Sequence, residues 1–476
     1  MAKLKNIIKQ LSAHDFQTLC DQLRAGNAEK SALLLRFIRE RQMSDEKIMK
    51  ELDVNTNAYY TLRSRLNQKI EEYLLQQMEN PRTDLLKKVA NISEVVFTKK
   101  RAIAIATLKK LEKELLDYDL ANELTVVYKN LKKLHINSPD SFSYSQLYNR
   151  HVAYMLALDK CEDLLADYFK KYGSYLLTGN EIEKMELDLL KRELDNVCKL
   201  YDSHRLYVYR HCVGIFHRFF VDTAENEEDE AVEDILANVE KTFETYYLDS
   251  VYYNLKPVFE YLKLEYYTHY KVWRKTEKYF EEVNENAATL LSNYSLYTFP
   301  AGFLLTKLDR AIRTETEGSL YVENKEIFEE FECDVNDVPK YLIYVCYRAL
   351  SCFFAGKYDE AHRYLNGLLN DLSLKRFPQA LIEVKLLLTL QYCLLRDFEL
   401  FNQSVNSIQR QIRLLNQGDD HSTLFIKLMK TAITETRPGK AAKIKSMAEK
   451  IRAKGVGHFS PIMIICSDDR FLEKMV

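Results

Sequence analysis

Apolar residues recur along this chain at intervals of three and four positions, and charged residues fill the positions between them. In residues 99–116 the apolar positions are Ile103, Ala106, Leu108, Leu111 and Leu115. Residues 118–135 repeat the pattern after a short turn, which predicts an antiparallel pair of amphipathic helices. Because no segment alternates apolar and polar residues between hairpin signals, we expect an all-α fold with at least five such pairs.

The same periodicity predicts helices over most of the remaining chain. They cover residues 143–172, 181–200, 203–221, 231–248, 251–270, 272–293, 300–314, 340–355, 358–371, 378–395, 398–415, 420–435 and 439–453. Two acidic segments, 222–234 and 316–339, interrupt the pattern, and the first is expected to be a solvated loop because like charges repel. The apolar stretch 461–465 predicts a buried connection or a short helix.

The repetition is clearest in residues 341–371. An apolar helix ends at Ala355-Gly356-Lys357, and a second helix follows. Gly356, Tyr358 and Ala361 match the turn of the tetratricopeptide repeat, and the segment resembles that family. Residues 378–415 look like a second copy in which Leu395-Arg396-Asp397-Phe398 replaces the Gly–Tyr turn. A period of about 34–40 residues is typical of helical solenoids, and unrelated helix pairs in a compact bundle are the alternative.

Residues 44–74 predict a short helix, a tight turn and a longer helix, which is the helix-turn-helix arrangement. The segment resembles the DNA-reading region of sigma factors and response regulators, although Asp53 replaces the turn glycine and Ala58 a threonine. An aspartate can adopt the left-handed turn conformation at some cost. The candidate nucleic-acid contacts of the second helix are Asn57, Arg63, Arg65 and Lys69. A bundle that only caps the solenoid is the alternative.

A second basic segment lies near the C-terminus, where residues 427–454 carry nine basic and two acidic side chains. Its candidate nucleic-acid contacts are Lys440, Lys443 and Lys445. The acidic segment 222–234 is an alternative partner for these lysines, and a solvated helix without a partner is another.

Tyrosine is unusually frequent, with 32 residues, and it clusters in residues 246–279. In each adjacent pair, Tyr252-Tyr253 and Tyr266-Tyr267, one ring is expected to lie between helices and the other on the surface. Tyr253, Tyr267 and Tyr270 fall on one predicted helix and are the candidate lining of a groove that binds protein. Packing between helices is the alternative role.

Composition narrows the classes of function. Only 12 glycines and 8 prolines occur in 476 residues, and the net charge is -2, so neither glycine-rich phosphate loops nor a bulk attraction to nucleic acid is expected. No secretory signal or membrane-spanning segment is visible. Nine scattered cysteines without a CxxC pair indicate a reduced, cytoplasmic location.

The known nucleotide-binding, hydrolase, metalloprotease and EF-hand motifs are absent from the sequence, and His204, His211 and His217 lack metal-ligand spacing. We therefore expect no enzyme activity, catalytic residue, metal or cofactor. The expected organisation is an N-terminal bundle (1–80), a first solenoid lobe (81–222), a second tetratricopeptide-like lobe (223–456) and a C-terminal tail (457–476).

Two functions fit this organisation. The first is a non-catalytic cytoplasmic scaffold or adaptor that binds a protein or peptide partner. The alternative is a regulator that combines a helix-turn-helix element with helical repeats and binds nucleic acid. Neither function involves a membrane, and the pattern predicts no oligomeric state.

Overall fold

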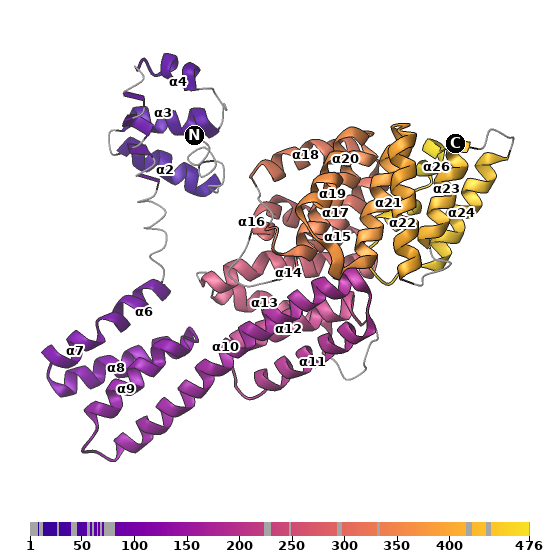
Figure 1. The fold of residues 1–476 in the computed structure, drawn as a ribbon. Coiled ribbons are helices and arrows are strands. Elements are labelled where there is room, and N and C mark those ends of the chain that lie inside the picture. Colours follow the sequence, from indigo (N-terminus) through magenta and orange to yellow (C-terminus); the bar gives the residue numbers. More distant parts are fainter. Residues whose placement is uncertain are drawn as a thin grey trace. The chain divides into compact units, whose positions relative to one another are not determined.

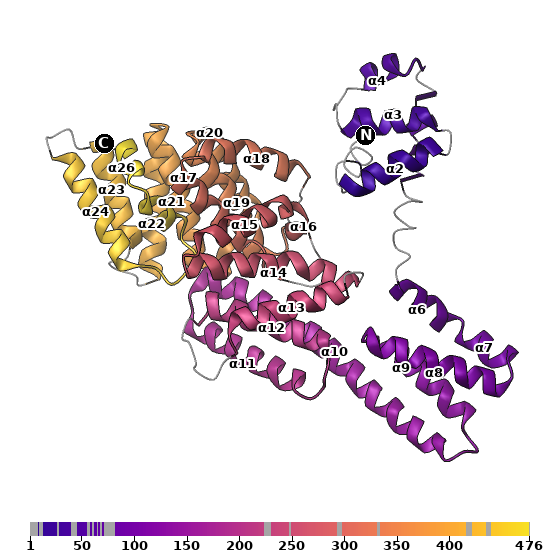
Figure 2. The ribbon, with the colours of Figure 1, turned by 180° about the vertical axis from the view of Figure 1, so that it is seen from behind.

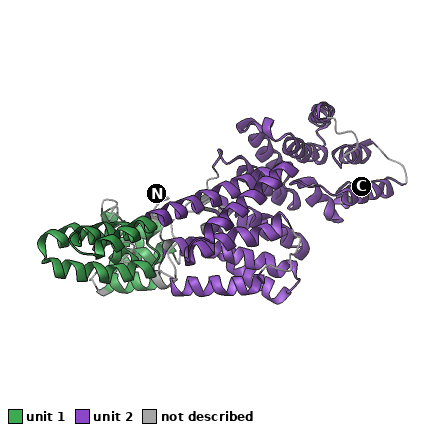
Figure 3. Cartoon of the chain, turned by 90° about the horizontal axis from the view of Figure 1, so that it is seen from below, with its two compact units in different colours: residues 1–151 green, residues 152–476 purple. Residues whose placement is uncertain are grey.

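The computed structural model forms two compact units, residues 1–151 and residues 152–476 (Figure 3). It describes residues 8, 13–25, 28–39, 45–54, 58–59, 61–63, 65–66, 69–70, 81–222, 230–246, 249–292, 298–330, 334–415, 421–434 and 439–475. Across these residues the regular structure is entirely helical, which confirms the predicted all-α fold. None of the described helices combines the length and the apolar character needed to cross a bilayer.

Among the described residues of unit 1, α2 (Ala13–Ala25), α3 (Glu29–Arg39) and α4 (Asp45–Glu51) are the first helices with given bounds. Their apolar sides share one buried cluster with Tyr59, Leu66 and Ile70 of the following segment. The turn after α4 contains Asp53, which has a φ of 50° and so takes the left-handed conformation expected at the position of the missing glycine.

The rest of unit 1 contains the predicted helix pair of residues 99–135. It consists of α8 (Arg101–Asp117) and α9 (Ala121–Leu134), which pack against each other and against α6 (Pro81–Ala90). Helix α7 (Ile92–Thr98) also packs against α8, and neither α6 nor α7 was expected from the pattern. Helix α10 (Asp140–Thr178) begins in unit 1 and continues into unit 2.

Unit 2 consists of helices that pack mainly against their neighbours in the sequence. Its helices after α10 are α11 (Glu181–Cys198), α12 (His204–Phe220), α13 (Val232–Thr245), α14 (Ser250–His269), α15 (Trp273–Glu285), α16 (Ala287–Ser292), α17 (Gly302–Thr314), α18 (Glu317–Glu330), α19 (Val338–Phe354), α20 (Tyr358–Asp371), α21 (Pro378–Leu394), α22 (Phe398–Leu414), α23 (His421–Thr434), α24 (Lys440–Lys454), α25 (Pro461–Ser467) and α26 (Arg470–Met475). Figures 1 and 2 show the later pairs, α19–α20, α21–α22 and α23–α24, stacked side by side.

Four helix pairs of unit 2 share one turn geometry. The first or second residue after the first helix has a positive φ in the pairs α14–α15, α17–α18, α19–α20 and α21–α22: Lys271 (56°), Glu315 (58°), Gly356 (74°) and Arg396 (60°). The next N–H then donates to a carbonyl five residues back, as from Lys357 to Cys352 at 2.7 Å, which is the Schellman motif. These turns recur at intervals of about 40 residues, the length of a helical-repeat unit.

Four sequence-based boundaries differ from the structure. The acidic segment 316–339 is not a break, because residues 317–330 form α18, and Asn324 of this helix donates to Ser351 Oγ of α19 at 2.8 Å. The predicted run 272–293 divides into α15 and α16 at Asn286. Helix α10 continues through Gly173. Residues 457–476, expected as a tail, contain α25 and α26, and α25 packs against α21 and α24.

Candidate functional site

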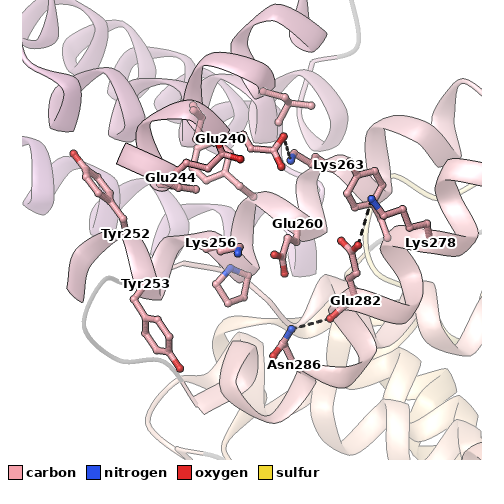
Figure 4. Close-up of a pocket in the computed structure, with 16 residues that line it drawn as sticks. Glu240, Glu244, Tyr252, Tyr253, Lys256, Glu260, Lys263, Lys278, Glu282 and Asn286 are labelled. Atoms are coloured by element: carbon pink, nitrogen blue, oxygen red, sulfur yellow. Dashed lines mark hydrogen bonds and ion pairs between the residues drawn. The ribbon is translucent and has the colours of Figure 1, made fainter. Parts of the chain in front are cut away.

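A groove in unit 2 lies between α13, α14 and α15, and its volume is about 700 Å³ (Figure 4). Its apolar lining includes Val239 and Phe243 of α13 and Pro257 and Phe259 of α14. Charged side chains from all three helices surround this lining: Glu240, Glu244, Lys256, Glu260, Lys263, Lys278 and Glu282. Apolar lining and charged surroundings suit a polypeptide segment better than a small polar metabolite.

The start of α14, the central helix of the groove, is held by a buried ion pair. Asp249 caps the helix by accepting a hydrogen bond from the backbone N–H of Val251 at 2.9 Å. The other oxygen of the same carboxylate pairs with Arg205 of α12 at 3.0 Å, and both side chains are buried. The capping carboxylate therefore connects the start of α14 to α12.

A proline inside α14 changes the backbone at the groove. Pro257 lines the groove and has no N–H, so it donates no helical hydrogen bond to the carbonyl of Tyr253 one turn earlier. Tyr253 also lines the groove, and its side chain is 65% exposed. Pro257 therefore leaves the Tyr253 carbonyl without its helical donor, next to an accessible aromatic ring.

The charged groups of the groove are not all paired. Lys263 pairs with Glu240 at 2.9 Å, and Lys278 pairs with Glu282 at 3.5 Å. Glu260 projects between these pairs in Figure 4, and none of the residues that the structure describes hydrogen-bonds to it or forms an ion pair with it. Burial raises the pKa of Glu260, partly against the attraction of Lys256. This carboxylate is the group in the groove that gains most from a cationic ligand.

The three tyrosines expected to line one groove lie in different surroundings. Tyr253 is in the groove, and Tyr270, 48% exposed, lies at the C-terminal end of α14 outside it. Tyr267 is buried and stacks on Tyr279 of α15, with ring centroids 5.5 Å apart. Lys275 lies over the Tyr267 ring at 4.4 Å. The structure therefore brings only Tyr253 to the groove, and Tyr267 joins α14 to α15.

Sequence reasoning missed most of the groove because three helices build it. Phe243 and Glu240 come from α13, and Lys278 and Tyr279 come from α15. One signal was visible in the sequence, since Pro257 lies inside an otherwise regular helical pattern at residues 251–270. A proline at such a position indicates a local backbone change that often marks a site.

The candidate nucleic-acid contacts are divided between the two units. In unit 1, Arg65 and Lys69 are exposed and Arg63 is half-buried, whereas Asn57 lies outside the described residues. In unit 2, Lys443 and Lys445 are exposed on α24, and Lys440 is half-buried at its start. Residues 223–229 of the acidic segment also lie outside the described residues, so its pairing with these lysines stays a prediction.

The histidines judged unsuitable as ligands have other contacts. His204 stacks on Tyr246, with ring centroids 4.2 Å apart, and His217 Nδ1 lies 3.0 Å from the Tyr168 hydroxyl. Within the described part of the chain, one group of three residues has the spacing to hold a metal ion. It consists of Glu383, His421 and His458, whose donor atoms all lie within 4.8 Å of one another.

The carboxylate of Glu383 in this group is fully buried. Burial alone would raise the pKa of Glu383, but hydrogen bonds from His421, His458 and Ser460 outweigh burial and hold the pKa below its ordinary value. No sequence motif marks this group, because its three members come from three distant segments. Comparison with known proteins gives no match to a family model, to a curated protein or to a solved structure.

Proposed function

We propose that this protein is a non-catalytic, tetratricopeptide-like scaffold or adaptor of the cytoplasm that holds a peptide segment of a partner protein in the α13–α15 groove. The observation that carries the proposal is the groove itself, with the unpaired carboxylate of Glu260 above an apolar lining. Arrays of helix pairs commonly bind other chains through such surfaces. The eight cysteines that the structure describes are buried thiols, which supports a reducing compartment.

The lining defines the chemistry of the proposed partner segment. A lysine or arginine of the segment pairs with Glu260, and a neighbouring apolar side chain packs on Phe243 and Pro257. A backbone N–H of the segment donates to the carbonyl of Tyr253, which Pro257 leaves without its helical donor. The partner is therefore an extended segment in which a basic residue is flanked by apolar residues.

Site-specific crosslinking in the native host tests this proposal. A photoreactive phenylalanine analogue replaces Tyr253 in one variant and Tyr270 in a matched control, since both side chains are exposed and Tyr270 directly follows the helix that carries Tyr253. We expect one protein to crosslink at position 253 and not at position 270. Equal yields at both positions, or no crosslink at position 253, would refute the groove as the binding surface.

Binding of the purified partner segment then measures the role of the carboxylate. Glu260→Gln keeps the size of the side chain and removes its charge, so we expect an affinity about 10 to 100 times lower, as for the loss of a charge-assisted hydrogen bond. Glu244→Gln is the control, because Glu244 lines the same groove as an exposed side chain. An equal effect of the two variants would show that Glu260 has no specific role.

A regulator that binds nucleic acid through residues 44–74 is the second proposal. The observations that favour it are the left-handed turn at Asp53 and the exposure of Arg65 and Lys69 on the following segment. The apolar face of the same segment, with Tyr59 and Leu66, packs in the bundle, as in a helix-turn-helix domain. The basic helix α24 would offer an additional phosphate contact under this proposal.

A further inference from the structure

Three segments that are distant in the sequence meet at the C-terminal end of unit 2. Glu383 lies on α21, His421 is the first residue of α23, and His458 lies between α24 and α25. The side chains of Glu383 and His421 are 2% and 9% exposed, and that of His458 is 14% exposed. Each segment contributes one side chain with a donor atom for a metal ion, and His458 gives solvent access to the cluster.

The donor atoms converge on one point. Nε2 of His421 and Nε2 of His458 both face Oε1 of Glu383; the second distance is 3.6 Å, and the first contact is a close hydrogen bond. The two imidazole rings are 5.8 Å apart between centroids. The other carboxylate oxygen, Oε2, accepts a hydrogen bond from Ser460 Oγ at 2.8 Å. Ser460 thus orients the carboxylate so that Oε1 faces both imidazoles.

Two imidazole nitrogens and one carboxylate oxygen form the ligand set of many zinc sites, which bind these atoms at about 2.0–2.2 Å. At that bond length, two ligands of a tetrahedral ion lie about 3.4 Å apart, close to the 3.6 Å between Glu383 Oε1 and His458 Nε2. The His421 ring must withdraw from its hydrogen bond with Glu383 to admit the ion. The hydrogen bond from Ser460 is the kind of outer contact that orients ligating carboxylates.

From this geometry we infer that Glu383, His421 and His458 form a binding site for a divalent transition-metal ion of the zinc class, with a water molecule as the fourth ligand. The ion ties the segment before α25 to α21 and α23. A dication also balances the buried charge of the Glu383 carboxylate. The inference is independent of the α13–α15 groove, which shares no residue with this cluster.

Titration of the chelator-treated full-length protein with Co²⁺ and Zn²⁺ tests the site. We expect one equivalent of Co²⁺ to bind with the visible absorption of a four-coordinate ion, Zn²⁺ to displace it, and protons to be released. His421→Ala and His458→Ala should each abolish the absorption band. His217→Ala is the matched control, because His217 is also buried beside a carboxylate, with its Nε2 3.0 Å from Asp188.

Two further variants keep the test decisive if a histidine variant fails to fold. Glu383→Gln preserves the size of the buried side chain and should abolish binding, and Ser460→Ala should weaken binding about 10 to 100 times through loss of the outer contact. Failure of the wild-type protein to bind one equivalent of Co²⁺ or Zn²⁺ would overturn the inference. Retention of the Co²⁺ band in folded His421→Ala/His458→Ala would also overturn it.

Discussion

Removal of Arg205 should destabilise the start of α14 more than any surface substitution does. The guanidinium and the carboxylate of Asp249 lie 3.0 Å apart, and their side chains are only 6% and 1% exposed. Arg205→Met leaves the Asp249 charge buried without its ion-pair partner, which typically costs about 3–5 kcal/mol. Because Asp249 also caps α14, the loss should appear first in the helix that carries Tyr253 and Glu260.

The partner substitution completes a double-mutant cycle. Asp249→Asn retains a good N-cap residue but leaves the Arg205 charge buried, so it should cost nearly as much as Arg205→Met. The double variant buries neither charge and should lose less stability than either single variant. The coupling between the two positions is expected to reach about 2–3 kcal/mol, near the upper end for neighbouring residues.

Urea unfolding followed by circular dichroism, together with hydrogen exchange of α12 and α14, measures these losses. Lys171→Met is the control, since the ion pair between Lys171 and Glu186 is 35% and 46% exposed and should contribute less than about 1 kcal/mol. The reasoning fails if Arg205→Met costs no more than this control. It also fails if the losses of the two single variants simply add in the double variant.

Three other predictions concern backbone, pH and salt. Gly356→Ala should lower the free energy of unfolding by about 1 kcal/mol because its φ is 74°, whereas Gly367→Ala inside α20 should raise it by up to about 1 kcal/mol. A methyl group meets no atom within 4 Å at either position, so urea midpoints that move in the same direction would contradict this account. Burial raises the pKa of Glu265 from 4.5 to about 7, so stability should fall as pH rises from about 4.5 through 7. Glu265→Gln should remove up to about 3 kcal/mol of that fall, and unfolding curves at pH 5 and pH 8 that match the wild type would contradict it. For DNA, replacing Arg65 and Lys69 by Ala should reduce the slope of log affinity against log salt by about 2, as measured by titration of a fluorescent duplex. An unchanged slope would show that these residues do not contact phosphates and would favour the bundle that only caps the solenoid.

Helix pairs whose burial follows their own periodicity were predictable from the sequence. In α8, the apolar positions Leu108, Leu111 and Leu115 are buried, whereas Ile103 and Ala106 are exposed. Spacing therefore locates the helix and the inner face of its C-terminal part. Helix α18 was not predictable, because its acidic residues dominate the pattern. It is held by Asn324, which accepts a hydrogen bond from Tyr347 of α19 at 2.7 Å, and periodicity does not encode such a contact.

The adjacent tyrosines show how much of the candidate site could be predicted from the sequence. One ring of each adjacent pair was expected to be buried, and Tyr252 is 1% exposed whereas Tyr253 is 65% exposed. In the second pair the buried ring is Tyr267, because α15 brings Tyr279 over that side of α14. The choice between the two rings depends on how the next helix packs. The cluster around Glu383 was unreadable for the same reason, since stacking of distant helices assembles it.

The single tryptophan of the chain has a practical consequence for work on the groove. Trp273 is the first residue of α15, the helix that contributes Lys278 to the groove, and its indole is 57% exposed. The tryptophan emission of the whole protein therefore comes from one place, the turn between α14 and α15. The emission wavelength of Trp273 and the quenching of its fluorescence should change if that turn rearranges when a peptide enters the groove. The wild-type protein thus carries its own optical probe for the binding experiments.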